Sequence, residues 1–577
     1  METFDIVIRN ATVIDGTRRP RYGADVGVRN GRIERIGDLA GARAATVLDA
    51  EDRIVAPGFV DNHTHYDAQI FWDPTCSNAG ENGITTVVMG NCGFGFAPVR
   101  PQDRDRAMIM METTEQVPAT RMRHALPWSW ESLPELVTAL ERTPKAVNCL
   151  MFMPLNLLMM YVMGVEAAKT RRPTPGEIGR MKALLHEAMN AGACGLSLTW
   201  MGRVNNHVDI DGTPVPTDIM SADDACEIAS VLRERGDGII ECISQIGPYG
   251  DRSISERLAR ETGRPVLHNV FSVSDLTPDL HLRSMDWLTK LNAEGVPIWA
   301  ETVVTRAWNE VDLFNSPGSA LDALDTYREL TVSRTREAKR AKLLDPDFCR
   351  RFRETYDPVM FEATGGDIRK YVVIGMGKSA NAASYLGRSL GEIAGAENKA
   401  VTDVFVALAL ESDLEIELRT PGIASNPKLV AELLSHPNVL AGTSDGGAHT
   451  KNFSGGQWTT DLLLWLTQEH ALFSLEEMHY RLSAQPAAVI GLKDRGILAE
   501  GMAADLVVYS PDELYIDQSH YLKLNDQPGG DWRRKAKAGG YRWIIVNGRI
   551  TFDGDKPTGA TPGTYLRVTG DAHRLAA

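Results

Sequence analysis

The sequence has few cysteines and none of the spacing that a disulfide framework requires. Seven cysteines are scattered irregularly over 577 residues, and no two of them form a Cys-x-x-Cys pair. We therefore expect neither a disulfide-stapled scaffold nor a zinc module built on paired cysteines. The thiols are expected to be free, as in a cytoplasmic protein.

Basic side chains are also scarce relative to acidic ones. Lys and Arg number 61 against 76 Asp and Glu, which gives a formal net charge of -15 at pH 7. Binding to nucleic acid or to an anionic membrane requires clustered cations, so neither is expected as a partner. The N-terminal residues METFDIVIRNATVIDG lack the charged and apolar regions of a signal peptide, and we expect a cytoplasmic location.

One apolar run, residues 147–165, approaches the length of a membrane span. It contains Asn148, Pro154 and Asn156, and no second run of this kind follows. A transmembrane helix requires about 20 consecutive, predominantly apolar residues. We therefore expect a buried strand that continues into an apolar loop.

The two ends of the chain share an antiparallel β pattern. Short alternating runs such as DIVIRNATVID and ADVGVRNGRIERIG near the start are matched by AADLVVYS and YRWIIVNGRITFDG near the end. Alternation of apolar and polar residues between Gly-rich turns is typical of half-buried strands. We expect residues 1–55 and 494–577 to form one small β-sandwich together.

Residues 56–493 between these ends alternate short apolar runs with helical segments. The eight runs are GFVDNHTH, GITTVVMGNC, AVNCLMFMP, ACGLSLTW, GIIECISQ, PVLHNVFSV, VPIWAETV and NVLAGTSDG. This alternation predicts an α/β fold, specifically a (β/α)8 barrel of the TIM type, with its chemistry at the C-terminal ends of the strands. Segments of about 101–135 and 305–400 are expected to be insertions over the barrel mouth. The basic run at 327–355 is expected to be a solvated amphipathic helix.

Polar residues follow three of the predicted strands in patterns that suit a metal ion. His63 and His65 stand two apart at the end of the first strand, so both side chains point to one side, and neutral imidazole is a common zinc ligand. Cys92 ends the second strand between glycines, where a thiolate can bind or bridge metal ions; a buried structural thiol is the alternative. Asp445, followed by His449, ends the last strand. Its carboxylate can serve as a ligand and can accept a proton from water.

Four stretches of the sequence resemble the amidohydrolase superfamily, and within it the branch of N-acyl-D-amino-acid deacylases. They are APGFVDNHTHYD (56–67), NGITTVVMGNCGFGFAPV (82–99), GTSDGGAH (442–449) and LSAQPAAVIGLKDRGILAEGMAADLVVYSPD (482–512). The resemblance implies a barrel with a small β-sandwich, a divalent metal ion, usually zinc, and hydrolysis of an amide bond. It also implies that His63 and His65 are first-strand ligands, that Cys92 is a ligand, that Asp445 is both ligand and general base, and that His449 faces the substrate.

The sequence departs from this branch at the fifth and sixth strands, where the deacylases supply histidines. The fifth strand carries Glu241 and Cys242 without a histidine, and His268 on the sixth strand does not fall on the family position. The tripeptide His449-Thr450-Lys451 also departs from the usual one, which bears on recognition of an acyl-amino-acid carboxylate. We expect one Zn²⁺ on His63, His65, Cys92 and Asp445. Glu241, Cys242 and His268 are the substitute ligands, and His449, His268 and Glu241 are the candidate substrate contacts.

Three functions are open at this point. The first is a metal-dependent hydrolase that cleaves an amide or cyclic-amide C–N bond, either of an N-acyl amino acid or of an apolar small molecule. The second is a metal-dependent lyase or C–C bond hydrolase that acts on an apolar carbonyl compound. The third is a non-catalytic binding member of the family. Specificity depends on variable loops, so the sequence fixes neither the substrate nor the oligomeric state, and a homo-oligomer is compatible with it.

Overall fold

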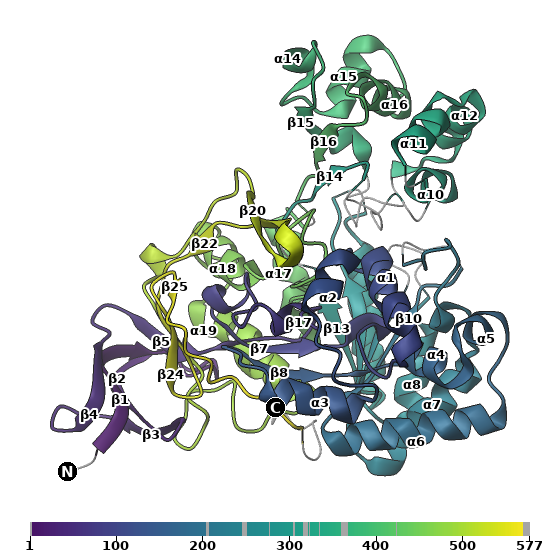
Figure 1. Cartoon of the computed structure of the whole chain (residues 1–577). Helices are drawn as coiled ribbons and strands as arrows, with labels where there is room; N and C mark the ends of the chain where they lie inside the picture. The colour runs from purple at the N-terminus through teal and green to yellow at the C-terminus, as the bar shows by residue number, and fades with distance from the viewer. Residues whose placement is uncertain are drawn as a thin grey trace.

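The computed structural model describes residues 3–203, 207–244, 251–275, 277–303, 306–314, 321, 324–333, 335–358, 367–422 and 424–568. Within these ranges, each of the eight apolar runs contains a strand. They are β6 (Phe59–Asp61), β7 (Ile84–Met89), β8 (Asn148–Met151), β10 (Gly195–Trp200), β11 (Ile239–Ser244), β12 (Val266–Phe271), β13 (Ile298–Thr302) and β17 (Val439–Ala441). Every ladder between these strands is parallel, which confirms the α/β prediction (Figure 1).

The parallel strands fall into two hydrogen-bonded sheets that share a core. One sheet has the order β6-β7-β8, and the other has the order β17-β13-β12-β11-β10-β9, where β9 (Met153–Pro154) follows β8 after one residue. Val60 of β6, Val88 of β7 and Leu440 of β17 belong to one buried hydrophobic cluster. An isolated parallel bridge also joins Thr64, after β6, to Gly446, after β17. The carboxyl ends of the first and last strands are therefore adjacent.

Helices connect these strands, as the sequence pattern predicts. Helix α6 (Pro175–Ala191) begins with a capping box between Thr174 and Glu177 and ends at Gly192, whose φ of 108° lies in the left-handed region. Helix α7 (Ala222–Arg235) lies between β10 and β11 in the chain. Further α-helices outside the 310–419 segment are α1 (Arg104–Thr114), α2 (Ala119–Ala125), α3 (Leu133–Arg142), α5 (Val165–Thr170), α8 (Ser253–Thr262), α9 (Leu280–Ala293), α17 (Pro427–Ser435), α18 (Trp458–Leu462), α19 (Leu475–His479) and α20 (Gln485–Ile490).

The apolar run at 147–165 is only partly as predicted. Its first part forms the buried strands β8 and β9, but the expected loop is helix α4 (Leu155–Met163), because Leu and Met favour a helix once Pro154 has set its start. In the described part of the chain, no helix is both long and apolar enough to cross a membrane.

Both ends of the chain contribute to one nine-stranded sheet. Its order is β25-β24-β23-β18-β5-β1-β2-β3, with β4 paired to β1. The strands from the start of the chain are β1 (Thr3–Val13), β2 (Tyr22–Arg29), β3 (Arg32–Gly37), β4 (Arg43–Asp49) and β5 (Ile54–Pro57). Those from the end are β18 (Leu506–Tyr509), β23 (Tyr541–Val546), β24 (Arg549–Asp553) and β25 (Lys556–Pro557). Two short pairs, β19 (Tyr515–Ile516) with β22 (Ala538–Gly539) and β20 (Leu522–Gln527) with β21 (Asp531–Lys535), lie between β18 and β23 in the sequence.

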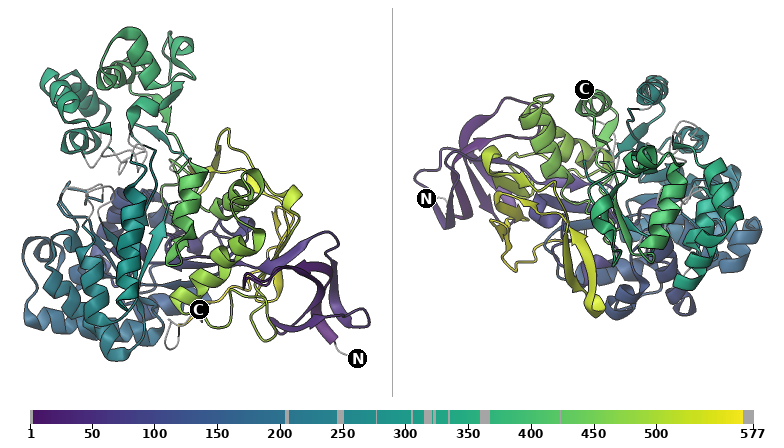
Figure 2. Two further views of the ribbon diagram at one scale, coloured as in Figure 1. Left: turned by 180° about the vertical axis from the view of Figure 1, so that it is seen from behind. Right: turned by 90° about the horizontal axis from the view of Figure 1, so that it is seen from above.

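Residues 310–419 form a lobe that projects from the rest of the molecule (Figures 1 and 2). Strands β14 (Glu310–Asp312), β15 (Val372–Met376) and β16 (Ile416–Arg419) form its sheet, and its buried hydrophobic residues form a cluster of their own. The basic run, expected as one helix, is three: α10 (Asp325–Thr331), α11 (Arg336–Leu344) and α12 (Pro346–Thr355). Pro346 cannot continue α11 and instead starts α12. The remaining helices of the lobe are α14 (Ala382–Tyr385), α15 (Leu390–Glu397) and α16 (Val401–Glu411).

Candidate metal centre

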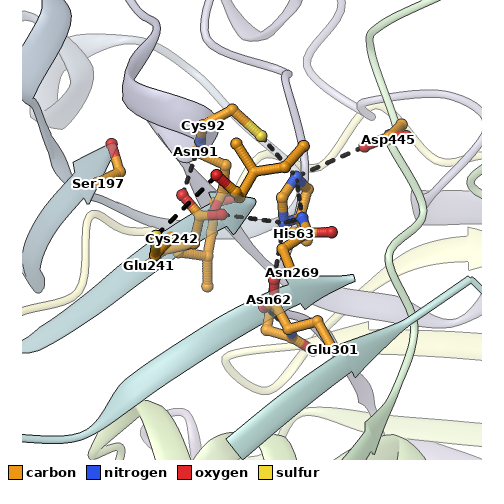
Figure 3. A network of polar contacts seen from close by, with 12 residues as sticks. Asn62, His63, Asn91, Cys92, Ser197, Glu241, Cys242, Asn269, Glu301 and Asp445 are labelled. Atoms are coloured by element: carbon orange, nitrogen blue, oxygen red, sulfur yellow. Dashed lines mark hydrogen bonds and ion pairs between the residues drawn. The ribbon is translucent and has the colours of Figure 1, made fainter. Parts of the chain in front are cut away.

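The four predicted metal ligands meet at the C-terminal ends of the parallel strands. His63 and His65 directly follow β6, Cys92 follows β7, and Asp445 follows β17. His63, His65 and Cys92 are buried, and Asp445 is partly exposed. Figure 3 shows the imidazole of His63 between Cys92, Asp445, Asn269 and Glu301.

The spacing of the donor atoms suits a four-coordinate ion. His63 Nε2 lies 3.4 Å from Cys92 Sγ and 3.5 Å from Asp445 Oδ1, and His65 Nε2 lies 3.7 Å from the same carboxylate oxygen. Ligand atoms that surround zinc tetrahedrally at about 2.0–2.3 Å are separated from each other by roughly 3.3–3.8 Å. All three spacings fall in this range, so the donor atoms of each of these pairs are near enough to share an ion.

The backbone holds two of these ligands in a conformation that side chains rarely adopt. The φ angles of Cys92 and Asp445 are 55° and 48°, and that of His449 is 52°. A non-glycine residue in this left-handed region costs of order 1–3 kcal/mol and persists only where its surroundings fix it. Cys92 is fixed by its backbone N–H, which donates to Glu241 Oε2 over 2.7 Å.

A buried carboxylate orients His63. Glu301, on β13, places Oε2 2.9 Å from His63 Nδ1, and its Oε1 accepts a hydrogen bond from the Asn62 amide. The Asn269 amide nitrogen lies 2.8 Å from His63 Nδ1 and packs against the ring. A carboxylate that accepts the Nδ1–H places the lone pair on Nε2, the atom that faces Cys92 and Asp445.

The charges around the histidines favour a cation at this place. Burial disfavours the charged imidazole of His63, but Glu301, Glu241 and Asp445 outweigh that effect and raise its pKa to about 10. Burial likewise opposes the charged form of His65, yet the Glu115 carboxylate, 3.4 Å from His65 Nε2, raises the pKa of His65. A divalent ion can take the place of these protons.

Asp445 and Cys92 respond to the same surroundings in opposite ways. Burial alone would raise the pKa of Asp445, but the imidazole of His65, 3.7 Å away, and the charge of His63 hold that pKa well below its usual range. Burial and the nearby Glu241 carboxylate raise the pKa of the Cys92 thiol well above its usual value. Asp445 is therefore ionised, whereas Cys92 must release a proton when it binds a metal ion.

Several buried polar atoms at the site lack hydrogen-bond partners among the described residues. They include both ring nitrogens of His65 and one carboxylate oxygen each of Glu115 and Glu241. Buried polar groups are ordinarily paired, so these atoms indicate a missing partner. Two groups have the spacing of metal ligands, namely His63 with His65 and Cys92, and His63 with Glu241 and Glu301. The donor set therefore fits a divalent cation.

The prediction that His268 lines the site is wrong. Its Nδ1 lies 2.9 Å from Ser255 Oγ on α8, and its ring packs against Phe271 and Trp287, with centroids 5.4 Å away in both cases. Successive strand residues point to opposite faces, so His268 faces the helices while Asn269 faces the site. Cys242 pairs with His268 in the β11–β12 register and points the same way, so it is not a substitute ligand.

Glu241 and His449, the other two candidate contacts, do lie at the site. Glu241 Oε1 is 4.0 Å from His63 Nδ1, and His449 Nε2 is 3.6 Å from Glu115 Oε2. The sequence reasoning missed Glu301, Glu115 and Asn269. Glu301 had a detectable signal, because it is an acidic residue at the end of the apolar run VPIWAET. Glu115 had none, because its place depends on where α1 ends.

Comparison with known proteins adds the family. The model of the amidohydrolase family matches residues 46–210 and 379–552, which is more than half of the chain. The chain belongs to this family. An N-acyl-D-aspartate deacylase of Alcaligenes xylosoxydans xylosoxydans is 27% identical to this amidohydrolase, over 98% of this chain and 96% of the relative.

Two solved structures show the same fold. One is an N-acyl-D-glutamate deacylase from Bordetella bronchiseptica in complex with zinc and a phosphonate inhibitor, with a TM-score of 0.66 and 23% identity over 98% of this chain and all of that one. The other is a D-aminoacylase with a binuclear metal centre, with a TM-score of 0.65 and 22% identity over the same shares. Because both identities are low, these structures establish the fold of this amidohydrolase and not its substrate.

Proposed function

We propose that this amidohydrolase hydrolyses an amide C–N bond of a small-molecule substrate with the help of one zinc ion held by His63, His65, Cys92 and Asp445. The observation that carries the proposal is the spacing of three donor pairs, which matches that of ligands around a tetrahedral zinc ion. These pairs are His63 Nε2 with Cys92 Sγ, His63 Nε2 with Asp445 Oδ1, and His65 Nε2 with Asp445 Oδ1. Three relatives that match almost the whole chain are named N-acyl-D-aspartate deacylase, D-aminoacylase and N-acyl-D-glutamate deacylase, and these names support an N-acylated amine as the substrate class. Neither they nor the family match favours a lyase or a non-catalytic protein.

When bound, a divalent cation polarises a carbonyl group and favours the ionisation of water. Asp445 is ionised and sits at the open end of the cluster, so its carboxylate accepts the proton of the attacking water. The tetrahedral intermediate then collapses with breakage of the C–N bond. Protonated Asp445 returns the proton to the leaving nitrogen, so one amide and one water give one carboxylic acid and one amine.

His449 is the residue that we assign to substrate contact. Its ring lies between Glu115, with Nε2 3.6 Å from the carboxylate, and Phe453, whose ring centroid is 5.8 Å away. Its backbone N–H donates to the Glu115 carbonyl over 2.8 Å. These contacts fix the ring beside Asp445 without using it as a ligand, so it can hydrogen-bond to the acyl group or to the leaving group.

The proposal includes a finer account of the fold. We infer that the two parallel sheets close into a (β/α)8 barrel across residues 56–493, because β6 and β17 share a core and a bridge joins the segments that follow them. The terminal sheet then folds as a composite sandwich of residues 1–55 and 494–577. Residues of about 101–135 cover the mouth, since Glu115 at the end of α1 reaches His65 and His449.

The test is a product assay with the full-length protein supplied with Zn²⁺. N-acyl-D-amino acids, other N-acylated amines and cyclic amides are offered, and released amine is measured together with mass spectrometry of all products. Asp445→Asn should lower kcat by about 10²–10⁴ for any substrate found, the usual contribution of a general base. Asp413→Asn, an exposed change in the projecting lobe, should have no effect. Full activity of Asp445→Asn, or carbon dioxide in place of amine, would contradict the proposal.

A further inference from the structure

Two buried carboxylates are in hydrogen-bond contact with the predicted ligands. Glu241 on β11 and Glu301 on β13 are both completely buried, and each contacts one ligand residue. We propose that Glu241 and Glu301 are positioning residues of a single-ion centre, and not ligands of a second ion. This inference rests on the proposed metal-dependent function. The position of the two acids beside the ligands is compatible both with binding a metal ion and with orienting the ligands, and we assign them the second role.

Both carboxylate oxygens of Glu301 already accept hydrogen bonds. Its Oε2 lies 2.9 Å from His63 Nδ1, and its Oε1 accepts from the Asn62 amide. Coordination of an ion by either oxygen would compete with the hydrogen bond made there, at a cost of about 1–3 kcal/mol for a buried N–H left without its acceptor. As an acceptor, the same carboxylate selects the Nδ1–H tautomer and aims Nε2 at Cys92 and Asp445.

The second candidate group of ligands depends on a His63 nitrogen that Glu301 already contacts. Glu241, Glu301 and His63 have metal-like spacing only through His63 Nδ1, which is 4.0 Å from Glu241 Oε1 and 2.9 Å from Glu301 Oε2. That nitrogen already faces the Glu301 carboxylate at hydrogen-bond distance. An ion there would displace the hydrogen bond that orients His63 toward the first ion, so the two ions would compete for one imidazole.

Glu241 positions the backbone of Cys92. Its Oε2 accepts the Cys92 N–H over 2.7 Å, and Cys92 is held at a φ of 55° that its side chain disfavours. Neighbouring hydroxyls complete the support: Thr199 Oγ1 donates to the Cys92 carbonyl, and Ser197 Oγ accepts from the Gly93 N–H over 3.1 Å. The peptide groups on both sides of the thiol are thereby fixed, which sets the direction of Sγ toward His63.

The experiment compares Glu301→Gln with Glu241→Gln, which make the same chemical change at two equally buried sites. Zn²⁺ stoichiometry and affinity are measured on the purified full chain by competition with a chromogenic chelator. Glu513→Gln, a change on the exposed surface, is the control. We expect one ion per chain in every protein. Glu301→Gln should raise the Kd about 10–100-fold, as is usual when the partner of a histidine ligand is removed. The effect of Glu241→Gln should be smaller, because the glutamine carbonyl still accepts the Cys92 N–H.

A second readout separates positioning from a merely structural role. Nitrogen NMR of the zinc-loaded protein should report a neutral His63 with its hydrogen on Nδ1 in the wild type, and a weakened Nδ1–H hydrogen bond in Glu301→Gln. If Glu301→Gln does not fold, Asn62→Leu removes one partner of the same carboxylate and should give a weaker shift in the same direction. Two ions per chain in the wild type, reduced to one in either variant, would overturn the inference. That result would leave the proposed hydrolysis intact, whereas a failure of every substrate to react would remove the proposed function alone.

Discussion

Removal of the metal ion should make the stability of the protein depend on pH in a specific direction. In the metal-free protein the pKa of His63 is raised to about 10, above the value of about 6.5 for an unfolded histidine. The folded state therefore retains a proton that the unfolded state loses above pH 6.5. The stabilisation is fully present below that pH and is lost as the pH rises through 10. Between pH 7 and pH 9 the loss from this one group is about 2.5 kcal/mol.

Glu241 should add to this loss. Burial raises the pKa of its carboxyl, so the folded state also keeps this proton to a higher pH than the unfolded chain does. Bound Zn²⁺ replaces the His63 proton and should remove the pH dependence, because metal affinity increases as its ligands deprotonate. Thermal melts at pH 7 and pH 9, with a chelator and with Zn²⁺, measure the effect. His63→Gln is the control, since it retains all other titrating groups. Equal stability of the metal-free wild type at the two pH values would refute the electrostatic account of the site.

Three further predictions concern single residues. Cys92→Ser should weaken Zn²⁺ binding by at least about tenfold, because a thiolate ligand is replaced by a neutral hydroxyl, and a chelator competition that shows no change would make Cys92 a structural thiol. His268→Leu should keep kcat/KM within about twofold and lower Tm modestly, because the side chain faces the helices. A loss of activity without a loss of stability would show that His268 does act at the site. Arg121→Met should lower the free energy of unfolding by about 3–5 kcal/mol, because Arg121 is buried and pairs with Asp531 at 2.7 Å, and denaturant unfolding with less than 1 kcal/mol of change would contradict this.

The positions of the eight parallel strands along the chain were predictable from the sequence, because each strand is short, apolar and followed by polar residues. The same rule predicted that His63 and His65 point together, since alternation within a strand depends only on local geometry. The position of Cys92 and Asp445 at strand ends was predictable because glycines flank the strand end in both cases. The regular residue patterns of the parallel strands therefore carried most of the information on the fold and on which residues lie at the site.

The errors in the predictions occurred where tertiary contacts determine which way a side chain faces or which conformation a segment adopts. His268 and Asn269 are adjacent, and only the register with β11 determines which of them faces the site. Glu301 lies 238 residues from His63 in the chain, and their contact has no local signal. The apolar loop after β9 is a helix because packing, more than polarity, determines the conformation of buried Leu and Met residues. The lobe at 310–419 has its own core, which the charge pattern of its helices does not reveal.

X-ray absorption of the zinc-loaded protein tests the central claim most directly, because it reports the atoms around the ion. We predict one zinc per chain with a single sulfur at about 2.3 Å and nitrogen or oxygen ligands at about 2.0–2.2 Å. In Cys92→Ser the sulfur shell should vanish while the nitrogen shell remains. A wild-type spectrum without sulfur, or one with a second zinc near the first, would contradict a single ion held by His63, His65, Cys92 and Asp445.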